Sequence, residues 1–199
     1  MITSPCAAAR AGRRPTTSAK GGATRRTELD GFDEEYEREL AEAQRRARAQ
    51  GRSDVLDYLS LKAANDRLRA RGVELLLGAF MALAGALNRV GAGVALMRTD
   101  AHRFRVGHST MVGPRLTLTR GLRSLTVEAG WPRTPRDGVV RGGGLASARI
   151  SHFGAPKAGE DLLLLPAGEE PRWFVLAETG ARTELLEHHL RRHVVRLLE

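Results

Sequence analysis

Apolar residues recur with a helical period in the first half of the chain. Between residues 54 and 88 they return every three or four positions, which is the spacing of one face of an α-helix. Gly72 interrupts the pattern, and the segment Val73–Leu87 beyond it carries a single charge, on Glu74. A helix that is apolar on every side is expected to be buried. The pattern therefore predicts a helix over 54–88 whose second half lies in the core.

Beyond residue 92 the apolar positions return every second residue instead. The segments that read as strands are 93–98, 102–106, 115–119, 124–129, 146–151, 162–165 and 173–177. Alternation of apolar and polar residues is typical of antiparallel strands with one buried face. After this β-rich region, 92–177, Thr183 opens a helix over 183–198. We therefore expect an α+β fold with N-terminal helices, an antiparallel β-sandwich or barrel of about seven strands, and a C-terminal helix.

The first 50 residues lack such an apolar face. Residues 1–28 are rich in small, polar and basic residues, and their only large aliphatic side chain is Ile2. This composition predicts a disordered basic tail. Residues 29–50 begin with acids and end with arginines, which suits the macrodipole of a helix. They predict an exposed charged helix, so that the globular α+β domain is expected to span 54–199.

The net charge of +9 and the pI of about 11 favour a polyanionic partner. Only Lys20, Lys62 and Lys157 among the basic residues are lysines, and alanine, glycine, leucine and arginine are abundant. A GC-rich, bacterial-like genome gives this preference for arginine, although it does not give the net excess of positive charge. The basic composition is therefore a weak indication of nucleic-acid binding by itself.

Cysteine content and hydropathy indicate the compartment. Cys6 is the only cysteine, so no intrachain disulfide forms, and no charged flank followed by an apolar run marks a signal peptide. The longest uncharged apolar run, Leu75–Asn88, has 14 residues. About 18 are needed to span a bilayer. We expect a cytoplasmic protein with no membrane partner.

The most unusual segment is Gly130–Gly144, which joins two expected strands and combines glycines, prolines, arginines and a tryptophan. Long loops of this kind carry function more often than other segments. The expected anion-binding residues are Trp131, Arg133, Arg136, Arg141, Gly142, Gly143 and Gly144. The arginines would supply forked donors, the glycines would let backbone N–H groups approach an anion, and the indole would stack on a ring. The alternative is a rigid linker with solvated arginines and a tryptophan that packs at the barrel edge.

For two further groups, the strand arginines and the histidines of the last helix, we favour a structural role over a functional one. Arginines at 103, 105, 115 and 149 would point outward from the strands and could hold nucleic acid, but a solvated outer face is the simpler explanation. His189 and His193 have the i,i+4 spacing of a zinc site without the glutamate or cysteine that would complete one. We interpret them, with His188, as surface histidines. The remaining histidines, His102, His108 and His152, are dispersed along the chain.

These patterns favour a non-enzymatic binding or adaptor module. Its Arg/Gly-rich loop would bind an anionic ligand or nucleic acid, and helices 33–48 and 73–87 would contact a protein partner or a second copy. An alternative is a structural protein that oligomerises through helix 73–87. An enzyme is disfavoured, because Asp100, Glu128 and Asp137 are the only acids of the β-rich region before residue 150. No phosphate-binding motif, metal site or cofactor is expected.

Overall fold

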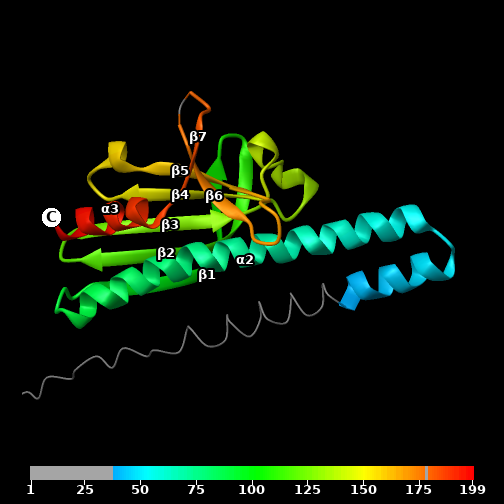
Figure 1. Cartoon of the computed structure of the whole chain (residues 1–199), viewed down its shortest axis with the longest axis horizontal. Helices are drawn as coiled ribbons and strands as arrows, with labels where there is room; N and C mark the ends of the chain where they lie inside the picture. Colours follow the sequence, from blue (N-terminus) through cyan, green and yellow to red (C-terminus); the bar gives the residue numbers. More distant parts are fainter. Residues whose placement is uncertain (1–37, 178) are drawn as a thin grey trace, which may run out of the picture. The chain divides into compact units, whose positions relative to one another are not determined.

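Two helices precede a seven-stranded antiparallel sheet, and a third helix follows it (Figure 1). The computed structural model describes residues 38–177 and 179–199. The expected tail 1–28, and the first part of the expected helix 29–50, lie outside these residues. The predicted fold class is confirmed in its α+β composition and order of elements. The strands form one open sheet, however, and not a closed barrel or two packed sheets.

The two N-terminal helices are joined by a short turn at Gly51. The first covers residues 38–49 and buries Ala47, and the left-handed conformation of Gly51 (φ 66°) then reverses the chain. The second helix, α2 (Ser53–Arg89), runs for 37 residues and passes through Gly72 without a break. Gly72 thus interrupts the hydrophobic pattern but not the helix.

Gly72 has a packing role in α2. Its carbonyl accepts a 2.8 Å hydrogen bond from Nε1 of Trp173, and a Cβ at this position would lie 2.6 Å from Cδ2 of Leu164. Because Gly72 has no side chain, the helix lies close to the sheet at this point. The carbonyl of Gly72 can then accept the hydrogen bond of the buried indole N–H. The glycine that weakens the helical pattern is therefore the point where α2 meets the sheet.

The strands follow one another in space in the order of the sequence, each antiparallel to the next. They are β1 (Ala95–Val106), β2 (Ser109–Arg120), β3 (Arg123–Gly130), β4 (Ala146–His152), β5 (Glu160–Leu165), β6 (Arg172–Leu176) and β7 (Arg182–Glu184). Two expected strands, 93–98 and 102–106, are one strand, β1, in which the register shifts between Thr99 and His102. The last helix, α3 (Glu187–Leu198), begins later than expected, because the chain first forms β7.

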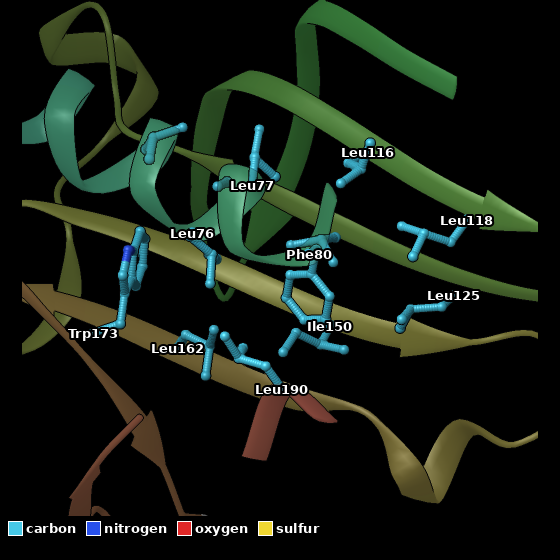
Figure 2. Packing of buried hydrophobic residues seen from close by; sticks show 14 of the residues in the cluster. Leu76, Leu77, Phe80, Leu116, Leu118, Leu125, Ile150, Leu162, Trp173 and Leu190 are labelled. Carbon is cyan, nitrogen blue, oxygen red and sulfur yellow. The ribbon is translucent and has the colours of Figure 1, made fainter. Parts of the chain in front are cut away.

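One face of the sheet forms the main core with α2 and α3 (Figure 2). The sheet contributes alternate residues, among them Leu116, Leu118, Leu125, Val127, Ala129, Ala146, Ala148, Ile150, Leu162 and Leu164. The residues of α2 that are buried are Gly72, Val73, Leu76, Leu77, Phe80 and Ala84. Only one side of the helix is therefore buried, although burial on every side was expected, and Leu75 is 45% exposed.

The apolar composition of α2 has two possible physical reasons. By length and composition alone the helix could cross a membrane, and a third of its most apolar stretch is buried in the fold. The structure supplies the other reason, because Leu77 and Phe80 pack against the sheet. This packing explains the buried side of the helix.

The opposite face of the sheet is covered at one end by the loop between β3 and β4. Leu163, which points away from the main core, is buried, and a side chain on Gly144 would overlap it. The far end of the β1–β2 hairpin also lies over this face, since Nη1 of Arg149 donates a 3.3 Å hydrogen bond to the carbonyl of Arg105. The loop and the hairpin end therefore meet above β4 and β5.

Candidate functional site

The first half of the loop between β3 and β4 is held by Asp137. This buried carboxylate accepts hydrogen bonds from the backbone N–H of Thr134 (3.0 Å), from its hydroxyl (2.9 Å), and from Nη2 of Arg103 on β1 (2.8 Å). The Thr134 hydroxyl, with smaller contributions from its backbone N–H and from Arg103, lowers the pKa of Asp137. Asp137 is therefore ionised and ties the short helix η1 (Pro135–Asp137) to the sheet.

The second half of the loop is fixed by backbone contacts. The hydroxyl of Ser109 donates to the carbonyl of Val139 (2.8 Å) and accepts from its N–H (3.3 Å). Gly142 and Gly143 in η2 (Arg141–Gly143) take left-handed conformations, with φ of 70° and 72°. The carbonyl of Gly142 accepts a 3.2 Å hydrogen bond from Arg182 on β7. This long loop is thus anchored to β2 and β7 and does not hang free.

Trp131 lies in the core at the start of the loop. It pairs with Val112 through two backbone hydrogen bonds, and its side chain is only 7% exposed. The guanidinium of Arg133 lies 3.9 Å from the centre of a ring of this tryptophan. The indole is therefore part of the core, with the guanidinium of Arg133 on one face of its ring.

Three exposed arginines lie near the loop. Within residues 38–177 and 179–199, the side chains of Arg105, Arg136 and Arg141 form no ion pair or hydrogen bond. The guanidinium of Arg141 lies beside Gly107 in the β1–β2 turn, where a Cβ would be 3.3 Å from Cζ. The loop therefore brings part of its positive charge next to the end of the hairpin.

Two arginines of the neighbouring strands, expected from the sequence to be solvated, form ion pairs with acidic side chains. Arg149 pairs with Asp161 (2.8 Å), and Arg103 pairs with Asp137. Glu128, between them on the sheet, contacts Nε2 of His102 at 2.6 Å. These pairs reduce the net charge of the outer face of the sheet.

Two histidines form a buried pair that the sequence did not reveal. Nε2 of His152 on β4 lies 2.9 Å from Nδ1 of His193 on α3, and Nε2 of His193 lies 3.3 Å from Oε2 of Glu160. The prediction of a surface position for His193 is wrong. A signal was present, because His152 continues the alternation of Ala146, Ala148 and Ile150, and this places it on the inner face.

Burial keeps both rings neutral. It is the main cause that lowers the pKa of His152 from its usual value near 6.5 to about 4, and the neighbouring His193 adds to the effect. Burial also lowers the pKa of His193, although Glu160 acts in the opposite direction. At neutral pH the pair is therefore held by a hydrogen bond between neutral rings, with Glu160 next to His193.

This pair predicts a loss of stability in weak acid. The folded protein keeps both rings neutral, whereas the unfolded chain binds protons below about pH 6.5, so stability falls as the pH is lowered from about 6.5 towards 4. Each histidine contributes at most about 1.4 kcal/mol for each pH unit. Urea unfolding at several pH values will measure the slope, which should be smaller in His152→Gln/His193→Gln. The exposed His188→Gln is the control and should keep the wild-type slope. Equal slopes in all three proteins would contradict the prediction.

The described part of the chain brings no three His, Cys, Asp or Glu side chains together in a way that could hold a metal ion. Comparison of the chain with protein-family models, with curated proteins and with solved structures finds no match.

Proposed function

We propose that the protein is a non-enzymatic binding module that takes an anionic ligand at the loop Gly130–Gly144. The observation that carries the proposal is that the loop is anchored to the sheet while two of its arginines have no acidic partner. Asp137 and Ser109 hold the loop to the sheet, whereas Arg136 and Arg141 are exposed and have no acidic partner among the described residues. A held loop supports binding because little ordering is needed when the ligand arrives.

The chemistry of these groups favours phosphate or carboxylate ligands. A guanidinium donates two parallel hydrogen bonds to such an anion, and this geometry makes arginine a common residue in anion sites. Arg182 lies beside Gly142 and adds a further positive charge. Trp131 supports the loop from the core in this proposal, and Arg133 lies over its ring. Nucleic acid is a larger ligand that offers the same phosphate groups to these arginines.

The test removes two loop arginines and compares them with two others. Arg136→Ala/Arg141→Ala should weaken binding to a heparin oligosaccharide by roughly tenfold or more, since hydrogen bonds to charged groups contribute about 1.5–3 kcal/mol each. Stability should change by no more than about 0.5 kcal/mol for each exposed substitution. Arg45→Ala/Arg48→Ala removes the same charge from the exposed side of helix 38–49 and is the matched control. Titration at two salt concentrations measures the effect.

Two results would contradict this proposal. If both pairs of substitutions weaken heparin binding equally, the interaction depends on total charge and not on the loop. If only deletion of residues 1–28 abolishes it, the basic tail is the binding element. A large drop in melting temperature on replacing Arg136 and Arg141 would show that they stabilise the fold.

A second candidate function is assembly through the outward side of α2. Between Glu74 and Arg89 this helix carries no charge, and its outward side includes the exposed Leu75 and Ala82. An uncharged exposed side supports contact with a second copy. The native mass at micromolar concentration tests this candidate, which a monomer would contradict.

A further inference from the structure

The end of the sheet opposite the loop Gly130–Gly144 presents apolar side chains to solvent. Val90 follows α2, Leu122 lies in the β2–β3 turn, and Phe153 follows β4. Their exposed fractions are 80%, 95% and 76%. Figure 1 shows the three connections at the same end of the sheet, together with the last residues of α3. Three separate turns therefore expose a large apolar side chain in the same region.

Hydrogen bonds hold these connections to one another. The backbone N–H of Phe153 donates to the carbonyl of Ser124 at 2.9 Å. Arg120 donates to the carbonyl of Ala92, beyond Val90, at 3.1 Å, and to the carbonyl of Leu198 at 2.6 Å. The turns and the end of α3 are therefore fixed relative to each other, and the apolar tips form one surface.

A shallow pocket lies beside one of these tips, Phe153. Its lining residues are Arg123, Ser124, His152, Phe153, Ala155, Arg196 and Leu197. Arg123 and Arg196 line this pocket together with Phe153, and Arg123 also follows Leu122 directly in the chain. The pocket is walled by the exposed ring of Phe153 and by two arginines, which suits a group with both apolar and anionic parts.

The same end carries an excess of positive charge. Its exposed basic residues are Arg89, Arg120, Arg123, Lys157, Arg192 and Arg196. Glu160 is already in contact with Arg192 and His193. Among the described residues, Arg123, Lys157 and Arg196 have no acidic partner. Uncompensated basic side chains therefore surround the apolar tips.

We propose that this end docks on an anionic phospholipid bilayer. Leu122, Phe153 and Val90 enter the boundary between headgroups and acyl chains, while Arg123 and Arg196 bind lipid phosphates. The combination fits an interface in which apolar and phosphate layers lie next to each other. Nucleic acid fits less well, because the two aliphatic tips cannot stack on bases as aromatic rings do.

This mode of binding differs from the one that the sequence excluded. The expectation of no membrane partner rested on the lack of a spanning segment, whereas docking requires only a few apolar side chains at turn tips. Each tip is a single residue within a turn, so no periodicity marks it. Leu122, for instance, follows Gly121 between two strands.

Sedimentation of the full chain with vesicles tests the proposal. Binding should be strong to phosphatidylcholine mixed with phosphatidylserine, weak to phosphatidylcholine alone, and weaker at high salt, because the basic side chains and the apolar tips act together. Leu122→Asp/Phe153→Asp should lower binding by tenfold or more, and Arg123→Ala/Arg196→Ala should lower it only for the anionic vesicles. Melting temperatures should stay close to that of the wild type, because the substituted side chains are exposed.

The controls change similar residues elsewhere. Leu61→Asp places an acid at an apolar residue that is 62% exposed in the first half of α2, and Arg45→Ala/Arg48→Ala removes two charges from helix 38–49. Both should bind vesicles as the wild type does. The proposal is overturned if Leu122→Asp/Phe153→Asp binds normally, or if vesicle binding is lost only in Arg136→Ala/Arg141→Ala. A wild type that does not sediment, but changes native mass when Leu122 and Phe153 are replaced, would show that a second copy covers this end.

Discussion

Replacing Phe80 by alanine should lower the free energy of unfolding by about 3–5 kcal/mol. Phe80 is fully buried where α2 crosses the sheet, and Figure 2 shows its ring among side chains from the helix and the strands. Alanine would leave a cavity that the helix cannot fill, because Gly72 is already in close contact with the sheet. Urea unfolding followed by circular dichroism will measure the loss.

Leu75→Ala is the control on the same helix. Because Leu75 is half exposed on the outward side, this change should cost less than about 1 kcal/mol. A cost for Phe80→Ala as small as that of the control would show that α2 does not close the core. An unchanged stability for Leu75→Ala combined with a changed native mass would instead favour the assembly function.

An alanine at Gly113 should also destabilise the protein strongly, by about 3 kcal/mol or more. A Cβ at this position would overlap the carbonyl oxygen of Ala129, and one at Gly130 would lie 2.6 Å from the carbonyl of Val112. The atoms in the way are backbone atoms, which cannot turn aside as a side chain can. Neither glycine has a positive φ, so the effect comes from the close approach of β2 and β3 alone.

Gly78→Ala tests the same chemical change where there is room for it. A Cβ on Gly78 meets no atom within 4 Å outside its own helix, and alanine is the better helix former by about 0.5–1 kcal/mol. This variant should therefore be as stable as the wild type or slightly more so. If Gly113→Ala unfolds at the same urea concentration as Gly78→Ala, the strands can separate at this point without cost.

The inner face of the sheet was predictable because alternation is a local property. The segments 115–119, 124–129 and 146–151 all alternate, and the structure buries the apolar positions of each. In these segments, local pattern and tertiary packing agree.

The closure of the sheet and the limits of its edge strands were not predictable in this way. Whether seven strands close depends on twist and on pairing between the first and last strands, which are far apart in sequence. β1 continues through a bulge at Ala101, which has a positive φ of 54°. Alanine rarely takes this conformation, so the residue type does not predict the bulge. β7 has only three residues, Arg182–Glu184, and depends on β6 for its conformation.

For the candidate site, the sequence located the loop but not the roles of its side chains. The glycines and prolines of Gly130–Gly144 predict a loop, since both residue types favour turns and are unfavourable inside helices and strands. Trp131 lies in the core because the backbone pairs with Val112 at that point, and Asp137 is an anchor because Arg103 reaches it from β1. Contacts between distant segments decide both roles.

The hydrogen bond between Gly72 and Trp173 joins residues 101 positions apart. During synthesis the apolar side of α2 therefore leaves the ribosome well before β5 and β6, which complete its covering. The strands, in contrast, each pair with the one made just before, so the sheet can extend as the chain grows. For that interval the nascent chain exposes the side chains of Leu77 and Phe80, and a chaperone that binds apolar helices would find its target there.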